Sequence, residues 1–338
     1  MLGISPNPSR EAGQLTIMGS LILIGCGAGL TSALLFSVIT TGSPLAIALY
    51  IVAPLPVMIA ALGWNHRTGL IAAATGAIAI ALFFNVYTAL AFLAGIALPG
   101  WLFSYLALLS RETPDGTEWY PAGRILAAIA FYAAGMTILG TFLIGGDYDS
   151  YLRGFERVVE AYAKADPQLL DALGGANSKS DIARFLAQLA PPISAAMSVA
   201  FSVGLLYAAG KIVARSGRLT RPFPILAQTE MPVRIVVIFG ASIVFALVLS
   251  EFPGLFARIT AASFGFAYAL QGLAVIHALT LGLASRIGIL SGTYFTLLII
   301  PGWPLALLCV IGLADTFFGW RAKKNARPPL TPSDTPLH

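Results

Sequence analysis

The chain has 338 residues, of which 57% are hydrophobic and only 10% are charged, and its mean hydropathy is +0.83. Soluble domains carry about 25% charged residues, so this chain cannot cover a water-facing surface and is expected to lie in lipid. The net charge of +5 does not indicate a nucleic-acid-binding protein, because the cations lie at the ends of apolar segments and no combined aromatic and basic motif is present.

Long apolar segments follow one another along the chain and predict an all-α, polytopic transmembrane helical bundle. Crossing about 30 Å of hydrocarbon takes roughly 20 helical residues, and most of the segments approach this length. They are Leu15–Thr40, Pro44–Trp64, Gly69–Phe84, Tyr87–Leu109, Ile125–Ile144, Pro192–Gly210, Ile235–Ser250, Phe264–Ala284 and Ile287–Trp320. The last is interrupted by the sequence PGWP, which predicts two short crossings or a re-entrant hairpin. We expect eight to ten spans and favour ten.

Polar stretches divide the chain into five regions. Residues 1–14 and the basic, proline-rich residues 321–338 cannot bury a core and are expected to be disordered. Residues 15–144 and 191–320 are the two parts of the transmembrane bundle. Between them, residues 145–190 form an extracytoplasmic helical insertion.

The insertion is predicted to consist of small helices. The sequence YLRGFERVVEAYAKA places Leu152, Phe155 and Val159 at helical spacing, which is typical of an amphipathic helix. DPQLLDAL and SKSDIARFLAQLAPP predict two further short helices, and the second is expected to end at Pro191. A structured loop is the plain interpretation of this region, and a lid over a binding site is the alternative.

The distribution of lysine and arginine predicts the orientation. The segment between Gly210 and Ile235 carries five basic residues against one acid, and four basic residues follow Trp320. Residues 145–190 carry five basic and seven acidic residues, so they fit the opposite side. An even number of crossings then places both termini in the cytoplasm.

Four polar residues lie within or beside apolar segments and are candidates for a substrate-binding site: Asn85, Gln271, His277 and Asp315. Because a charge at the bilayer centre costs roughly 2.5–3.5 kcal/mol on insertion scales, such groups usually face the bundle interior. Structural interpretations remain open for each. Asn85 fits a turn between two spans, and His277 fits a histidine bonded to a carbonyl. Gln271 and His277 lie about 120° apart on a helix and need not serve one site.

Asp315 lies on one helix face with Gly312 and Gly319, six residues before Arg321. Glycines let a neighbouring helix approach closely, so Asp315 is expected to point into the bundle. There it accepts hydrogen bonds from a neighbouring helix or pairs with an arginine at the helix end; substrate or proton handling is the alternative. On this interpretation Asp315→Asn keeps the fold, whereas Asp315→Leu impairs packing.

Prolines and glycines predict broken helices at Pro54, Pro56, Pro99, Gly100, Pro301 and Gly302. Broken helices free backbone groups at membrane depth, and transporters place binding sites at such positions, although kinks also occur without a ligand.

Several catalytic signatures are absent from the sequence: HExxH, a Walker A motif, GxSxG and a paired-aspartate magnesium motif. With three histidines, a multi-histidine metal site is not expected, nor is a cofactor, and an enzyme is the least favoured class.

The order of these features resembles the YybS-like family of predicted multi-pass membrane proteins, a family of unknown function. The resemblance rests on the run of spans, the insertion ending in LAPPISAA, the basic KIVARSGRL, and the closing GLADTFFGWR, which contains Gly312, Asp315 and Arg321. That family is in turn similar to the substrate-capturing components of energy-coupling-factor transporters, which implies a bundle that holds a small molecule and works with ATPase partners. This chain departs from them in having more than six expected spans and a larger outer insertion.

We therefore expect a transporter-like or small-molecule-binding component of a bacterial inner membrane. The alternative is a non-transport scaffold or regulatory protein. The expected partners are the lipid bilayer, a small-molecule substrate, and an ATPase or envelope protein. Convergence of Asn85, Gln271, His277 and Asp315 on one cavity would favour the first interpretation, and scattering would remove its main support.

Overall fold

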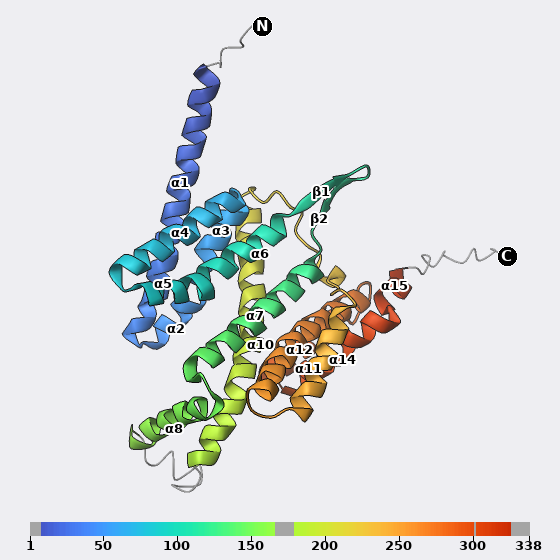
Figure 1. The fold of residues 1–338 in the computed structure, drawn as a ribbon. Coiled ribbons are helices and arrows are strands. Elements are labelled where there is room, and N and C mark those ends of the chain that lie inside the picture. Colours follow the sequence, from blue (N-terminus) through green and yellow to red (C-terminus); the bar gives the residue numbers. More distant parts are fainter. Residues whose placement is uncertain (1–7, 166–178, 301, 326–338) are drawn as a thin grey trace, which may run out of the picture.

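The computed structural model describes residues 8–165, 179–300 and 302–325, which are almost entirely helical, and this confirms the predicted all-α bundle (Figure 1). The first part contains α1 Pro8–Ser37, η1 Val38–Thr41, α2 Pro44–Ile51, α3 Leu55–Gly63, α4 His66–Phe83, α5 Val86–Phe92, the π-helical η2 Leu93–Ala97, α6 Leu98–Leu108, β1 Ser110–Thr113, β2 Gly116–Trp119 and α7 Ala122–Gly145. The second contains α8 Tyr148–Ala165, α10 Lys179–Arg215, η4 Leu226–Gln228, α11 Ile235–Val248, α12 Glu251–Leu279, α13 Arg286–Ile299, α14 Gly302–Phe318 and α15 Trp320–Asn325.

Seven helical stretches of the described chain are long and apolar enough to cross a membrane, judged by length and composition. Seven is fewer than the eight to ten spans expected from the sequence, and the number reaches ten only if the shorter apolar helices α11, α13 and α14 are included. Helix α13 ends at Ile299 and α14 begins at Gly302, so the last apolar segment is divided into two helices, as predicted. Pro301 itself lies outside the described residues.

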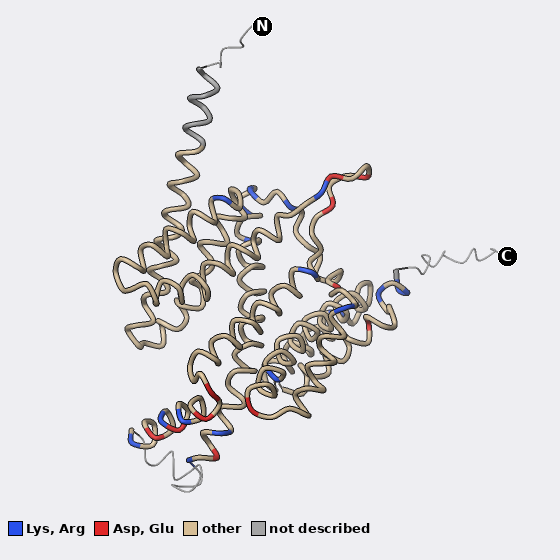
Figure 2. Tube along the Cα trace, in the orientation of Figure 1, with Lys and Arg blue, Asp and Glu red and all other residues tan. Residues whose placement is uncertain are grey.

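The two ends of the bundle differ in charge. The amino end of α1, the β1–β2 hairpin and α15 lie at one end, and α8 lies at the other (Figure 1). Lysine and arginine gather at the first end, whereas α8 carries both signs of charge (Figure 2). We call the first end the cation-rich end. The amino end of α1 and helix α15 thus lie on the side of the basic loops.

The prediction of a short helix ending at Pro191 is wrong, because α10 runs unbroken through Pro191 and Pro192 to Arg215. A proline at position 191 has no N–H for the carbonyl of Ala187, four residues earlier. The hydroxyl of Tyr151, on α8, donates to that carbonyl oxygen at 2.6 Å. A side chain from the predicted amphipathic helix therefore supplies the bond that the proline removes, and α10 continues. The helix predicted from DPQLLDAL lies outside the described residues.

Tyr151 also holds α8 against the bundle. Its side chain is fully buried, together with Ala187, Ala195, Leu255 and Ile259. Burial raises the pKa of Tyr151 above its ordinary value, so its hydroxyl remains a donor throughout the physiological range. The apolar face predicted for α8 is thus the face that packs on α10 and α7.

The predicted helix break near Pro54 is present, whereas the break predicted at Pro99 is wrong, because the chain stays helical from Val86 to Leu108 and has only a π-helical turn before Pro99. The chain turns between α2 and α3 at residues 52–54. Before Pro99, the N–H of Leu98 bonds to Leu93, five residues back, so the Ala94 carbonyl finds neither its α-helical donor nor a donor on Pro99. The Tyr132 hydroxyl of α7 donates to that carbonyl.

Other element boundaries differ from the predictions. Helix α12 begins at Glu251 rather than Phe264, because Pro253 falls in its first turn, where proline is tolerated. Helical structure also extends into both segments predicted to be disordered, since α1 begins at Pro8 and α15 reaches Asn325. At the C-terminal end, Lys324 donates to three carbonyl oxygens that follow or end α12, at 2.7–3.1 Å.

The hairpin of β1 and β2 was not predicted. Its strands pair in antiparallel register across the turn at Pro114 and Asp115, with Gly116 at φ +120°. The sequence TPDG is a turn signal that could have revealed it. Arg111 and Glu118 pair across the strands at 2.6 Å, and both side chains are exposed.

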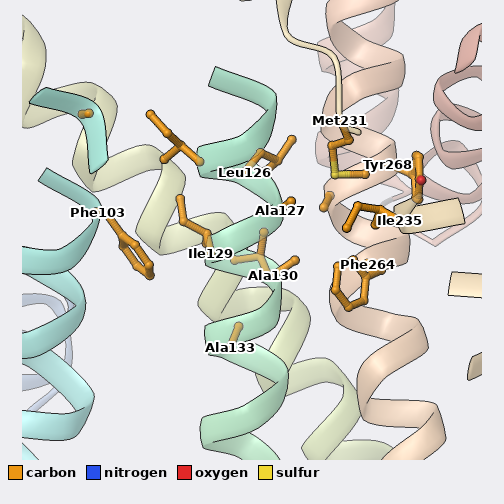
Figure 3. Close-up of a cluster of buried hydrophobic side chains, with 14 of the residues drawn as sticks. Phe103, Leu126, Ala127, Ile129, Ala130, Ala133, Met231, Ile235, Phe264 and Tyr268 are labelled. Carbon is orange, nitrogen blue, oxygen red and sulfur yellow. The ribbon is translucent and has the colours of Figure 1, made fainter. Parts of the chain in front are cut away.

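The main core lies where α7 meets its neighbours in the middle of the bundle. Ile129 and Phe103 fill the space between α7 and α6, while Ala130 faces Phe264 of α12 (Figure 3). Met231, from the segment before α11, enters the same core. This core positions the walls of the pocket described next.

Candidate functional site

A pocket of about 430 Å³ lies between α7, α10 and α12 at the cation-rich end of the bundle. Its walls come from the amino end of α7 and the carboxyl ends of α6, α10 and α12, with Tyr294 of α13 at one side. The volume falls in the range of roughly 300–1,000 Å³ that is usual for ligand pockets.

The lining is mostly apolar and carries a few polar groups. The polar side chains are Tyr207, Arg221, Thr229, His277 and Tyr294, and no acid is present among the described residues that line the pocket. Such a lining suits a mainly apolar ligand that is oriented by a small number of polar contacts.

One wall of the pocket is the segment of residues 216–234, which contains no helix longer than the single 3-10 turn η4 and which we call the strap. It joins α10 to α11, and it begins where Gly217, at φ +69°, ends α10. Three prolines keep most of it from forming a helix. Its lining residues are Leu219, Arg221, Phe223, Pro224, Leu226 and Thr229.

Gln271 of α12 anchors the strap. Its side chain is completely buried on α12, where Oε1 accepts from the backbone N–H of Met231 at 2.8 Å. Its Nε2 donates to the carbonyl of Gly312 at 2.8 Å and to Oγ1 of Thr316 at 2.9 Å. This amide therefore joins the strap, α12 and α14 through three hydrogen bonds.

Asp315 and Arg321 form a second anchor. The Asp315 carboxylate accepts a hydrogen bond from Nε of Arg321 at 2.7 Å and forms an ion pair with Nη2 at 2.7 Å, and both side chains are buried. Nη1 of Arg321 donates to the strap carbonyls of Ala227, at 3.2 Å, and Thr229, at 2.8 Å. The predicted pairing of Asp315 with an arginine at the helix end is thus present, and it fixes the strap.

The two predicted glycines near Asp315 have different roles. A Cβ on Gly312 would lie 2.1 Å from the carbonyl oxygen of Tyr268, and one on Gly272 would lie 1.9 Å from that of Leu308. The backbones of α12 and α14 therefore touch through these glycines. Gly319 does not belong to this face, because it ends α14 at φ +58° and donates to the Asp315 carbonyl at 2.8 Å.

His277 lies in the pocket wall. Its Nε2 shares a hydrogen bond with the Tyr294 hydroxyl at 2.9 Å, and both residues line the pocket. The expected bond from His277 to a backbone carbonyl is replaced by this contact. It links α12 to α13, a helix with no buried residue among its side chains.

Arg221 is the charged residue of the lining. Its Nη1 donates to the carbonyl of Ala107 near the end of α6 at 3.0 Å, and no carboxylate of the described chain forms an ion pair with it. Burial lowers the pKa of Arg221, but an arginine starts at about 12.5, so its guanidinium stays charged at neutral pH.

Asn85 is remote from this site. It caps α5 by accepting from the backbone N–H of Thr88 at 2.9 Å, in the turn that follows α4. Helix α5 lies on the far side of α7 and α10 from α12 (Figure 1). The four candidate residues therefore do not converge on one cavity: His277 lines the pocket, Gln271 and Asp315 anchor its strap, and Asn85 caps a helix elsewhere.

The helix break near Pro54 borders a different surface. A Cβ on Gly100 would lie 3.3 Å from the Pro54 carbonyl oxygen, so the turn at Pro54 packs closely against α6. A shallower apolar groove of about 280 Å³, lined in part by Val52 and Pro56, opens beside them. Gly302 begins α14 away from both cavities.

Arg221 was missed by the sequence reasoning, which looked for polar residues inside apolar segments. The signal was the sequence RPFP, a cation among prolines and an aromatic residue in a loop between two spans. Within the described chain, histidine, cysteine, aspartate and glutamate form no group of three or more that would suit a metal ion.

No curated protein and no solved structure matches the chain. A family model described as "Predicted membrane protein (DUF2232)" matches residues 30–316, which include the pocket, the strap and Asp315. This confirms the resemblance to a family of predicted membrane proteins, whereas similarity to energy-coupling-factor components is not shown. The chain belongs to this family of membrane proteins of unknown function.

Proposed function

We propose that the protein is a small-molecule-binding, transporter-like component of a bacterial inner membrane, and that its ligand occupies the pocket beside the strap. Because the four polar candidates do not converge on one cavity, the support expected from the sequence is lost, and the proposal rests instead on the pocket of about 430 Å³ with few polar groups in an apolar wall. From the positive-inside rule we infer that the cation-rich end, the strap and both termini face the cytoplasm.

The strap anchors support this proposal. Gln271 and the Asp315–Arg321 pair use buried polar groups to fix a loop that makes a pocket wall. Buried polar residues in membrane helices are costly and are usually retained for a purpose. Here they give an otherwise irregular segment one defined position at the pocket.

Gly204 offers a way to fill the pocket. It lines the pocket on α10, and a Cβ built on it meets no atom within 4 Å. Leucine at this position should therefore occupy pocket volume without displacing the backbone. Gly135 of α7 is a matched control, because its Cβ also meets no atom within 4 Å and it does not line the pocket.

The test is to release the protein gently from native membranes and record its intact mass. We expect wild type and Gly135→Leu to carry a discrete small-molecule adduct, and Gly204→Leu to lose it while keeping the same thermal stability. An adduct that survives Gly204→Leu would overturn the pocket assignment. Release with lipid alone, or with an envelope protein partner, would favour the scaffold alternative.

A further inference from the structure

The charge balance of the pocket constrains its ligand. Arg221 is the single charged side chain among the described residues that line it. A partly buried charge without a partner is unfavourable. A ligand that brings the missing negative charge would remove this penalty.

The guanidinium of Arg221 has N–H donors that form no hydrogen bond to the described chain. An arginine carries five N–H donors, and one hydrogen bond to a protein acceptor, the Ala107 carbonyl, is formed here. That bond fixes the head group against the end of α6. The planar fork suits a carboxylate or phosphate, which it can bind through two parallel hydrogen bonds.

Neighbouring cations add to the positive field around Arg221. Nζ of Lys211 lies 4.2 Å from the centroid of the Phe223 ring, and Phe223 lines the pocket. The Arg218 guanidinium lies 4.6 Å from the Trp64 ring. Both cations contact aromatic rings, and no acid of the described chain forms an ion pair with either of them. Their positive charges are therefore not neutralised by an ion pair.

The remaining walls of the pocket favour a ligand with an apolar chain. Ile125, Leu126 and Ile129 of α7 face Leu273 and Ala274 of α12 in the lining. Contacts of this kind favour hydrocarbon, because burial contributes about 25 cal/mol per Å² of apolar surface. The volume of about 430 Å³ lies toward the lower end of the range for ligand pockets, so we expect a ligand with one apolar chain rather than two.

We propose that the ligand is an amphiphile with one apolar chain and one anionic group, and that the anionic group pairs with Arg221. This inference rests on the proposed function and adds the ligand class to it. The chain lies between α7 and α12, and the head group lies at the strap on the cation-rich side.

The test uses the full-length protein in nanodiscs of phosphatidylcholine, and it counts bound molecules by native mass spectrometry. The probes are dodecyl phosphate, the neutral dodecanol, inorganic phosphate alone and the two-chain phosphatidylglycerol. We expect saturable binding of dodecyl phosphate, at least tenfold weaker binding of dodecanol, and no saturable binding of inorganic phosphate or phosphatidylglycerol.

Arg221→Gln separates charge recognition from the pocket itself. We expect it to weaken dodecyl phosphate binding roughly ten- to hundredfold, the effect of one charge-assisted hydrogen-bonded contact, and to leave dodecanol unchanged. Arg111→Gln, on the exposed hairpin, is the matched control and should change neither.

Two outcomes overturn the inference in different ways. If dodecanol binds as tightly as dodecyl phosphate and Gly204→Leu abolishes both, the anionic head group is wrong and the proposed pocket stands. Saturable binding of phosphatidylglycerol or of free phosphate at the same site shows that the source of the anion is a membrane lipid or an inorganic ion, and it removes the single-chain assignment.

Discussion

The buried pair of Asp315 and Arg321 gives the sharpest prediction about stability. Their side chains are 3% and 9% exposed, so solvent screens their interaction little. Asparagine at position 315 keeps the shape of the side chain but leaves the guanidinium buried without its carboxylate. Removing one partner of a buried pair costs about 3–5 kcal/mol.

We expect the lower end of this range, about 3 kcal/mol, for Asp315→Asn. Arg321 keeps its two strap carbonyls, and the Glu230 carboxylate, at 3.8 Å, offers a weaker, more exposed partner. This reverses the sequence-based expectation that asparagine would be tolerated. That expectation rested on the similar shape of the amide and the carboxylate, whereas the structure shows a buried ion pair whose negative charge asparagine removes.

The assay is reversible unfolding in mixed micelles, titrated with sodium dodecyl sulfate and followed by circular dichroism. The double variant Asp315→Leu with Arg321→Met removes both charges of the pair, so it should be more stable than Asp315→Asn. In the double-mutant cycle of wild type, Asp315→Leu, Arg321→Met and the double variant, we expect a coupling energy on the order of 2 kcal/mol. Glu118→Gln breaks the exposed pair with Arg111 and should cost roughly 0–1 kcal/mol. If Asp315→Asn behaves like this control, the reasoning is refuted.

Three further predictions follow from backbone contacts and topology. Gly272→Ala should destabilise the protein by about 1–3 kcal/mol in the same assay, because the new Cβ would meet the backbone of α14. Gly135→Ala, whose Cβ meets no atom, should be neutral or slightly stabilising. Equal effects of the two substitutions would contradict the close approach of α12 and α14. Tyr151→Phe should cost about 1–3 kcal/mol by leaving a buried carbonyl without a donor, and a smaller cost in a Pro191→Ala background, where the backbone N–H returns, is the check. In a variant without the native cysteines, a new cysteine on α8 should react with an impermeant thiol reagent in intact spheroplasts, and one in the β1–β2 turn should react only after permeabilisation; the reverse pattern would invert the proposed orientation.

Apolar segments alone predicted most of the fold. The apolar helices, the amphipathic α8 and the break near Pro54 follow from hydropathy, helical spacing and the missing proline N–H. The continuation of α10 through Pro191 did not follow, because it depends on Tyr151, a residue 40 positions away in the sequence. Local rules state what a proline removes, and tertiary contacts decide whether another donor replaces it.

The candidate site was predicted only in part. Gln271, His277 and Asp315 were identified because polar groups in apolar helices need partners, and the partners proved to be the strap, Tyr294 and Arg321. The strap itself looked like an ordinary basic loop. Its position as a pocket wall depends on contacts between segments distant in sequence, which periodicity and composition do not contain.

The most direct test of the ligand pocket is the experimental density of protein purified from native membranes. We expect a continuous non-protein feature between α7 and α12 whose polar end lies at about 2.7–3.2 Å from the guanidinium of Arg221. A preparation that carries a small-molecule adduct while this pocket is empty, with density at another surface, would contradict the account.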